Sequence, residues 1–421
     1  MIRRRLLLIG AAVIAAACVE DLTTPGVCPA YCPGNQLTIA DTVLYDLSRD
    51  SSFRGYVLPH QSAVLLAANL PGVVDGRPIF RINGPGSRFR INPNDTTTGP
   101  ILGSDSAKLQ FVISRRDSTA TNLTLRFYRL PKTIDSTTTF ADVSGAFTDS
   151  LVRTLNIDTL LAKPNRKDSV TGDSAAVDTT GHLLTLFMKF DSTAARYIAA
   201  DSGSVAYGIR ISADSLASVT IAKTTLTSVL SGPLLTWYVQ VDSSGVSVPR
   251  TLGTFQAAFA SFVSSPPPPP IDSTLAVGGA PSARSIVRVA FPRVIRDSSQ
   301  IIRATLILVP AVAARGAPID SFAVEVHAVL VDLGAKSPIA VDVLHTNSTM
   351  IHIGATDTVR IEVTNVLQAW AADSTQPTTL VLKPKNEAQS FAEIRFYPTI
   401  AAAFRPSLQI TFVRRYPFGG R

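Results

Sequence analysis

Histidine and glutamate, which supply much of acid–base catalysis, are rare among the 421 residues of this chain. The five histidines are His60, His182, His327, His345 and His352. None belongs to a His-Glu-x-x-His pattern, and no Gly-x-Ser-x-Gly pattern accompanies them. His345 and His352 would face each other on a hairpin, but two ligands without a carboxylate form a weak metal site. We therefore predict no catalytic and no metal site, and expect these two histidines at the surface.

Glycoside hydrolysis is the least favoured alternative. It stays open because its acid and its nucleophile can be carboxylates from distant strands. Glu325, Glu362 and Glu393 each stand between apolar residues, and alternation along a strand turns such residues outward. We expect them to be solubilising surface residues, and we expect no enzyme. The many Asp-Ser pairs lack the Asp-x-Asp-x-Asp-Gly spacing of a calcium loop, so we interpret them as turn caps.

Cys18 has the clearest chemical assignment. Three arginines at positions 3–5 precede an apolar stretch, Leu6–Ala16, that is too short to span a bilayer, and Ala15-Ala16-Ala17-Cys18 ends it. Small residues directly before a cysteine resemble the lipobox of bacterial lipoproteins, in which that cysteine is acylated and becomes the new N-terminus. We predict a signal peptide at 1–17 and lipidation of Cys18, with simple cleavage and release as the alternative.

Acyl chains would hold the protein at a membrane, because each buried methylene contributes about 0.8 kcal/mol. Val19, directly after the cysteine, resembles the residue found in lipoproteins sent to the outer membrane of Gram-negative bacteria. Residues 18–36 lack periodicity and contain several prolines and glycines, so we expect a flexible tether. Within it, Cys28 and Cys32 are predicted to form a local disulfide, because no second cysteine or histidine pair completes a metal site. Two free thiols are the alternative.

The charge of the chain gives no indication of nucleic-acid binding. The formal charge of +8 falls by three, to +5, when the signal peptide leaves. No dense basic run interleaved with aromatic residues remains, and an exported protein meets little nucleic acid. Arginines at 414, 415 and 421 cluster in a predicted C-terminal tail, 414–421. The expected partners are a membrane, through the lipid anchor, and a polysaccharide or an envelope protein, with no nucleic acid and no cofactor.

Alternation of apolar and polar residues predicts strands along most of the chain. Val359, Ile361 and Val363, for example, alternate with Arg360 and Glu362, so one face is buried and the other is wet. Most connections are short and contain turn residues, which favours antiparallel pairing. Two half-buried sheets that face each other form a sandwich. We predict an all-β fold of two tandem jelly-roll-like sandwich domains, each with a short helix.

The same order of elements occurs twice along the chain. Gly76-Arg77-Pro78-Ile79 in the first copy corresponds to Ala283-Arg284-Ser285-Ile286 in the second, and short helices are expected at 191–198 and 364–371. The length also exceeds what one hydrophobic core usually organises. The predicted boundaries are 37–241 for the first domain, with an insertion at about 156–181, then 242–249 for a linker and 250–413 for the second domain.

Five consecutive prolines, 266–270, predict a stiff polyproline segment. The residues before them, 260–263, look like the opening strand of the second domain, so we place the prolines in a rigid loop inside that domain. A true linker at 264–272 is the alternative.

Exposed aromatic residues would indicate a glycan-binding surface, because the C–H faces of sugars stack on rings. Trp237 alternates in phase with Leu235 and Val239, and Trp370 falls on a predicted helix, so both are expected in the core. The expected surface aromatics are Tyr128, Tyr238, Tyr397 and Tyr416.

The second copy resembles the DNRLRE-type domain of secreted bacterial proteins. The residues that carry this resemblance, in the order of the family's motifs, are Arg284–Phe291, Ala304–Leu308, Val359–Trp370 and Arg405–Phe412. Residues 51–56 look like the opening strand of that family at the start of the first copy, which lacks the Arg-Pro ending. The resemblance implies a jelly-roll sandwich related to carbohydrate-binding modules, some of which bind polysaccharides while others serve in adhesins or scaffolds. It brings no catalytic residues.

The favoured function is that of a noncatalytic outer-membrane lipoprotein whose sandwiches bind a surface glycan or another envelope component. The alternative is a structural scaffold or assembly partner without glycan affinity, and a polysaccharide-active enzyme is less favoured than either. A concave face that gathers outward aromatics with arginine and aspartate would support the first function.

Overall fold

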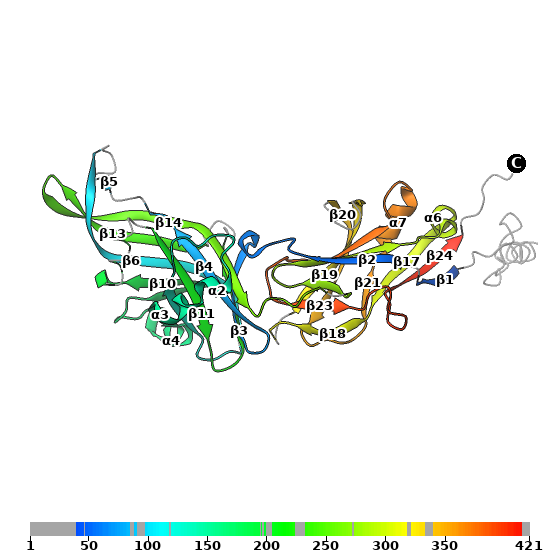
Figure 1. Ribbon diagram of the computed structural model, residues 1–421, viewed down its shortest axis with the longest axis horizontal. Coiled ribbons are helices and arrows are strands. Elements are labelled where there is room, and N and C mark those ends of the chain that lie inside the picture. Colours follow the sequence, from blue (N-terminus) through cyan, green and yellow to red (C-terminus); the bar gives the residue numbers. More distant parts are fainter. Residues whose placement is uncertain are drawn as a thin grey trace, which may run out of the picture.

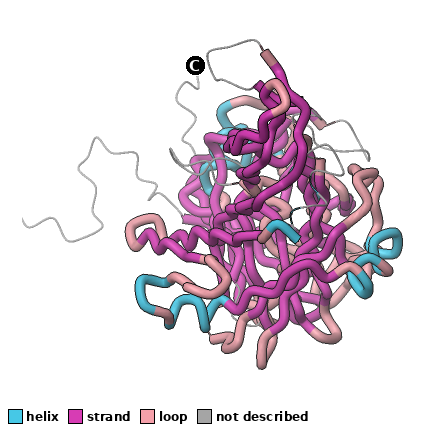
Figure 2. Tube along the Cα trace, turned by 90° about the vertical axis from the view of Figure 1, so that its left-hand side faces the viewer, coloured by secondary structure: helices cyan, strands magenta, loops and turns pink. Residues whose placement is uncertain are grey.

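The computed structural model describes residues 39–414, except 46, 85–87, 91–96, 118, 194, 196–197, 199–203, 224–231, 272, 318–320 and 333–339. Strands make up most of these residues, and the pairings between them are antiparallel. Short helical segments lie mostly at the outside of this strand-rich body (Figure 2). The all-β fold class is therefore confirmed.

The strands form two groups along the long axis of the molecule, which we call the first and the second unit (Figure 1). The first unit comprises residues 56–265. In chain order it contains η1 (Pro59–Gln61), β3 (Val64–Leu70), β4 (Val74–Ile82), β5 (Arg88–Arg90), β6 (Thr98–Arg116), β7 (Thr124–Arg129), α2 (Phe140–Ser144), α3 (Ala146–Asp149), β8 (Leu151–Asn156), α4 (Ile157–Ala162), η2 (Pro164–Arg166), β9 (Ser174–Asp178), β10 (Leu183–Phe190), β11 (Val205–Ser212), β12 (Ala217–Ala222), β13 (Leu234–Ser243) and β14 (Val246–Ser265).

The second unit combines residues 39–54 with residues 275–414. Its elements are β1 (Ile39–Leu44), β2 (Leu47–Arg54), β15 (Leu275–Gly278), β16 (Ala283–Val289), α6 (Arg293–Ser298), β17 (Ser299–Leu308), β18 (Pro310–Arg315), β19 (Ser321–Val331), β20 (Ala340–His352), β21 (Val359–Glu362), α7 (Thr364–Ala372), β22 (Thr379–Pro384), β23 (Glu393–Phe396) and β24 (Ser407–Arg414).

One strand path runs through the first unit and closes on itself. It follows the order β14-β13-β6-β12-β3-β4, and β4 pairs again with β14. The inward side chains of these strands share one hydrophobic cluster, in which Trp237 is fully buried. Its indole nitrogen donates to the Ser104 hydroxyl at 2.7 Å, which satisfies the polar atom that burial removes from water. The predicted core position of Trp237 is confirmed.

The second unit packs a four-stranded sheet, β1-β24-β17-β21, and an eight-stranded sheet that contains β16, β19, β20 and β22 around one cluster. Helix α7 covers this cluster and matches the helix predicted at 364–371. Its buried residues Val366, Leu367 and Trp370 are spaced three and four apart, as one face of a helix requires. Trp370 is fully buried as predicted. Trp370→Ala would lower the free energy of unfolding by about 3–5 kcal/mol.

The order of the strands differs from the predicted tandem arrangement. β1 pairs with β24, so that Ile39 lies opposite Val413, and β2 pairs with β16, so that Ser52 lies opposite Ser285. Figure 1 shows these N-terminal strands beside the C-terminal ones. Residues 39–54, which were predicted to open the first domain, therefore complete the second unit. The first unit is inserted between β2 and β15.

The predicted linker at 242–249 is instead the turn of a hairpin. β13 and β14 pair from Ser243 opposite Val246 to Leu234 opposite Gln256. Gly245 adopts a φ of 85° at this turn, and its amide donates to the Asp242 carboxylate at 2.7 Å. Asp and Gly mark a tight turn as readily as a linker, and this explains the wrong boundary. The predicted insertion at 156–181 holds α4, η2 and β9, and β9 adds to the sheet beside β10.

The prolines 266–270 connect the two units. The preceding residues 260–263 belong to β14 and pair with β4, so they do not open the second unit. The rigid loop predicted inside the second domain is thus wrong, and the alternative, a linker at 264–272, fits the pairings. The segment is held from the second unit, because the Arg395 guanidinium donates to the carbonyls of Pro269 and Pro270, both at 2.9 Å.

Glu393 is buried beside this linker, contrary to its predicted outward position. Only 6% of the residue is exposed, and its carboxylate forms ion pairs with Arg54 and Arg395, both at 2.8 Å. Two guanidinium groups, from strands far apart in sequence, share this carboxylate. A buried charge is tolerated only with such partners. The cluster therefore joins β2, β23 and the proline linker.

Candidate functional site

The three cysteines predicted as lipid-modified or disulfide-bonded residues, Cys18, Cys28 and Cys32, lie outside the described residues. His345 and His352 lie on one strand, β20, and not on the two arms of a hairpin. His352 is exposed, whereas His345 is half-buried and contacts the Asp342 carboxylate. Among the residues that the structure describes, no group of three histidine, cysteine or acidic side chains is arranged to hold a metal ion.

A groove of about 460 Å³ lies where the two units meet, which is within the usual range for ligand sites. Strands β3, β6 and β12 of the first unit supply one wall. Strands β19, β20 and the segment after β22 supply the other. The lining residues are Val64, Ser114, Arg115, Thr220, Ser321, Phe322, Ala323, Ser348, Met350, Pro384, Lys385, Asn386, Gln389 and Ser390.

The composition of this lining favours an anionic, hydroxyl-rich ligand. It contains two cations, Arg115 and Lys385, and no carboxylate. Five hydroxyl groups and the amides of Asn386 and Gln389 offer both donors and acceptors. Lys385 is exposed, and within the described residues its ammonium group makes no ion pair. The positive charge of Lys385 in a concave site attracts anions.

The units are fixed to each other beside the groove. The Ser62 hydroxyl of the first unit donates to the Ala388 carbonyl of the second at 2.9 Å. Phe262 and Phe391 meet edge to face, with ring centroids 5.7 Å apart. Val64, Leu66 and Ala280 pack around the same rings. An apolar, hydrogen-bonded junction of this kind fixes the position of one wall of the groove relative to the other.

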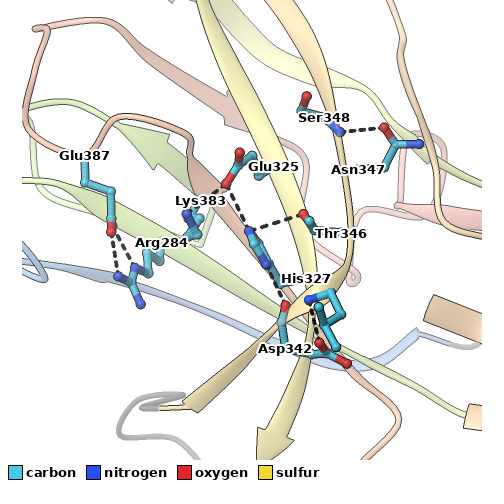
Figure 3. A network of polar contacts seen from close by, with 10 residues as sticks. Arg284, Glu325, His327, Asp342, Thr346, Asn347, Ser348, Lys383 and Glu387 are labelled. Carbon is cyan, nitrogen blue, oxygen red and sulfur yellow. Dashed lines mark hydrogen bonds and ion pairs between the residues drawn. The ribbon is translucent and has the colours of Figure 1, made fainter. Parts of the chain in front are cut away.

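The wall from the second unit continues into a row of paired polar side chains on the outer face of the eight-stranded sheet. Alternation along β19 points Phe322, Val324 and Val326 into the core and turns Glu325 outward. Glu325 lies opposite Ser348 on β20 and Lys383 on β22. Figure 3 shows the resulting network, in which Lys383 donates to Glu325 at 2.9 Å. The predicted outward position of Glu325 holds, but the side chain is paired and half-buried.

His327 occupies the centre of this network and is 5% exposed. One ring nitrogen contacts the Asp342 carbonyl at 2.9 Å, and the other contacts the Glu325 carboxylate at 3.0 Å (Figure 3). Both partners are hydrogen-bond acceptors, and the Thr346 hydroxyl also lies 3.3 Å from the second ring nitrogen. A ring held in this way has no free nitrogen for a substrate. The arrangement fits a role in holding β19 and β20 together.

The electrostatics of the network keep its carboxylates charged. Burial acts to raise the pKa of Glu325, but hydrogen bonds from Lys383 and His327 outweigh it and lower that pKa below its ordinary value of 4.5. The contact with His345 is the main cause that lowers the pKa of Asp342. Arg284 holds Glu387 through two hydrogen bonds of 2.6 and 2.7 Å (Figure 3). The carboxylates closest to the groove are thus neutralised by their own cations.

A second polar depression, of about 340 Å³, lies on the outer face of the four-stranded sheet. Arg303 and Arg360 line it together with Glu362, Thr305 and two β24 residues. Here Glu362 forms an ion pair with Arg303 at 3.2 Å, so part of the positive charge is compensated inside the depression. Glu362 faces outward as predicted. The groove between the units is the stronger candidate for an anionic ligand.

Within the described residues, the aromatic side chains do not gather on a concave face. Tyr128 is 5% exposed and packs against Phe147 with ring centroids 5.1 Å apart, so its predicted surface position is wrong. Tyr238 and Tyr397 are partly buried, and Tyr416 lies outside the described residues. The most exposed aromatics are instead Tyr45, at 52%, and Phe404, at 48%. Neither was among the predicted surface aromatics, because neither lies in an alternating strand.

No helix in the described part of the chain has the length and apolar character needed to cross a membrane. In comparisons with known proteins, no family model matches the chain, and no curated protein gives a significant match.

Proposed function

We propose that this protein is a noncatalytic lipoprotein of the cell envelope that binds an acidic glycan in the groove between its two units. The observation that carries the proposal is the lining of the groove, which places Arg115 and Lys385 among hydroxyl and amide groups without a carboxylate. Uronic acids and other acidic sugars present a carboxylate beside several hydroxyls. Such ligands match both the charge and the hydrogen-bonding groups of this lining.

The groove also contains the apolar surface that sugar rings require. Met350 is 56% exposed in the lining, whereas Val64 and Phe322, which also line it, are 6% and 8% exposed. The C–H groups of a sugar ring can pack against Met350, while the ring hydroxyls reach Ser348, Asn386 and neighbouring groups. Glycan recognition here would depend mainly on polar contacts, because an aromatic platform is absent from the lining.

Three further parts of the proposal concern the anchor and the domain class. A signal peptide at 1–17 and an acylated Cys18 would export the chain and hold it at the outer membrane, with residues 18–36 as a tether. The two units would be jelly-roll-like sandwiches, the second related to the DNRLRE-type domain. Residues 51–56 resemble the opening strand of a DNRLRE-type domain. Residues 51–54 pair with β16 of the second unit, which supports a relation between the second unit and this family.

A glycan array probed with the mature chain tests the proposal. We expect saturable binding to polymers that contain uronic acids and little binding to neutral polymers of the same length. Binding should weaken as the salt concentration rises, because the contacts include charged groups. Equal binding to acidic and neutral polymers, or an array without any signal, would contradict it.

A specific observation favours one other function, an assembly partner without glycan affinity. Strand β20 lies at the edge of its sheet, where Val343 and Leu344 are 73% and 81% exposed. An open edge with apolar side chains accepts an extended segment of another envelope protein. Under this alternative the array is blank, and Leu344→Lys releases a partner that co-purifies with the wild-type chain.

A further inference from the structure

An apolar loop between β23 and β24 projects from the second unit. Residues 400–404, Ile-Ala-Ala-Ala-Phe, contain no polar side chain, and Ile400 is 79% exposed. Ala402, Ala403 and Phe404 are exposed as well. A run of exposed apolar residues is costly in water and usually marks a contact with a partner or a membrane.

The loop is held in its exposed position by defined contacts. The Thr399 amide donates to the Asp50 carboxylate of β2, and the Ala401 amide donates to the Pro398 carbonyl at 3.1 Å. Tyr397 and Phe404 stack with ring centroids 4.9 Å apart and an interplanar angle of 30°. The base of the loop is thus fixed, and Ile400 remains outside this packing.

Tyr45 and Arg405 extend the apolar surface with an aromatic ring and a cation. The Arg405 guanidinium lies 4.9 Å from the centre of the Tyr45 ring, and both residues are exposed. Tyrosine, phenylalanine and arginine next to aliphatic residues are typical of protein surfaces that lie at the boundary between lipid headgroups and acyl chains. Arginine adds attraction to anionic headgroups.

The position of this surface in the chain fits a bilayer as its partner. Tyr45 directly follows β1, the strand through which the chain from Cys18 enters the second unit. Residues 19–38 separate Cys18 from Ile39 at the start of β1, and Tyr45 follows the other end of this six-residue strand, so an acylated Cys18 would keep the second unit within a chain length of the lipid. A glycan is a poorer match, because the stacked rings use faces that a sugar would need and the apex offers no polar side chain.

We propose that residues 397–405, together with Tyr45, form a membrane-contacting surface that inserts Ile400 and Phe404 into the headgroup region of the bilayer. The proposal rests on the proposed function only in placing the protein at the envelope, and it requires neither acylation nor glycan binding. A second, weak attachment would orient the molecule on its tether and keep the groove at a fixed direction relative to the membrane.

Vesicle co-sedimentation tests this surface with a chain that starts at Val19 and therefore carries no acyl group. The vesicles contain phosphatidylethanolamine and phosphatidylglycerol. We expect the wild-type chain to sediment with them, and Ile400→Asp together with Phe404→Asp to reduce the bound fraction by roughly tenfold or more, because the apolar contact is lost. Leu344→Asp is the matched control, since Leu344 is equally exposed on β20 and should leave binding unchanged.

A fluorescence measurement provides a second readout that does not depend on loss of binding. The emission of Ile400→Trp should shift to the blue on addition of vesicles, and that of Leu344→Trp should not. No sedimentation of the wild-type chain, equal sedimentation of the double variant, or no shift for Ile400→Trp would overturn the proposal. Glycan binding that Ile400→Asp abolishes would overturn it in favour of a sugar site. Lys385→Glu should leave sedimentation unchanged, so failure of the groove and failure of this surface are distinguishable.

Discussion

The Ser52 and Ser285 hydroxyls lie 2.6 Å apart, although 233 residues separate them in sequence. The Ser52 hydroxyl oxygen also lies 2.9 Å from the Thr274 carbonyl oxygen and accepts from the Ala276 amide at 3.1 Å. Ser285 donates to the Ala276 carbonyl at 2.8 Å. Strand β2 is thus bonded to both β15 and β16. The second unit is complete only when residues from both sides of the first unit come together.

Replacement of Ser285 should therefore destabilise the second unit. Ser285 is fully buried, and Ser285→Ala leaves the Ala276 carbonyl without its side-chain donor. We expect the free energy of unfolding, measured by denaturant titration, to fall by about 1–2 kcal/mol. Ser247→Ala on the exposed β13–β14 hairpin should change it by less than about 0.5 kcal/mol. Equal effects of the two substitutions would contradict the proposed packing of β2.

Much of the fold could be predicted from local patterns, and the pairing of β2 could not. Alternation identifies which face of a strand is buried, so it located Trp237 and the strands around it. Helical spacing did the same for Trp370. Alternation does not identify the neighbouring strand, and a segment such as 51–54 satisfies the same pattern next to either unit. The repeated order of elements therefore led to the prediction of a tandem arrangement.

The buried carboxylate of Glu393 provides a test of the cluster that joins β2, β23 and the proline linker. Glu393→Gln keeps the shape of the side chain but leaves the guanidinium groups of Arg54 and Arg395 without their shared anion. Breaking a buried ion pair from one side costs about 3–5 kcal/mol, and we expect a loss of this order in the free energy of unfolding. The proline linker should also become more susceptible to proteolysis, because Arg395 holds two of its carbonyls.

The matched control is Glu362→Gln, since the Glu362 side chain is 37% exposed and its ion pair with Arg303 lies in contact with water. A loss below about 1 kcal/mol is expected for this variant. If both glutamate variants were equally stable, the account of the buried cluster would be wrong.

The candidate groove was beyond prediction from sequence for a related physical reason. Arg115, in β6, and Lys385, in the segment after β22, are ordinary surface residues, and no local spacing relates them. The groove exists because the units pack through Phe262 and Phe391, which come from opposite sides of the proline linker. The outward position of Glu393 was predicted wrongly for the same reason. Alternation along its strand cannot show that its partner, Arg54, comes from the N-terminal strand β2.

The stability contributed by Glu325 should depend on pH. Its pKa is lowered in the folded protein, so its contribution is fully present above its ordinary pKa of 4.5 and is lost as the pH falls through the lower, folded value. The difference in free energy of unfolding between the wild type and Glu325→Gln should be constant at neutral pH and shrink below pH 4.5. Urea titrations across this range measure it. If the difference in free energy of unfolding between the wild type and Glu325→Gln were the same in strong acid as at neutral pH, this would contradict the contacts of Glu325 with Lys383 and His327.

Acylation of Cys18 is a separate prediction with its own measurement. In a Gram-negative host, mass spectrometry of the purified full-length product should show a chain that begins at Cys18 and carries acyl groups. Cys18→Ser should be recovered without lipid and in the soluble envelope fraction, because its apolar anchor is gone. A wild-type product that is cleaved but carries no lipid would support the released form instead.

Calorimetric titration of a soluble oligouronate into the mature chain tests the binding of an acidic glycan in the groove most directly. The wild type should bind saturably, and Lys385→Glu should weaken binding by about tenfold or more, because it places a negative charge against the ligand's carboxylate. Lys167→Glu makes the same change of charge at an exposed position of the first unit and should bind like the wild type. Affinity that Lys385→Glu leaves unchanged would contradict a glycan site between the units.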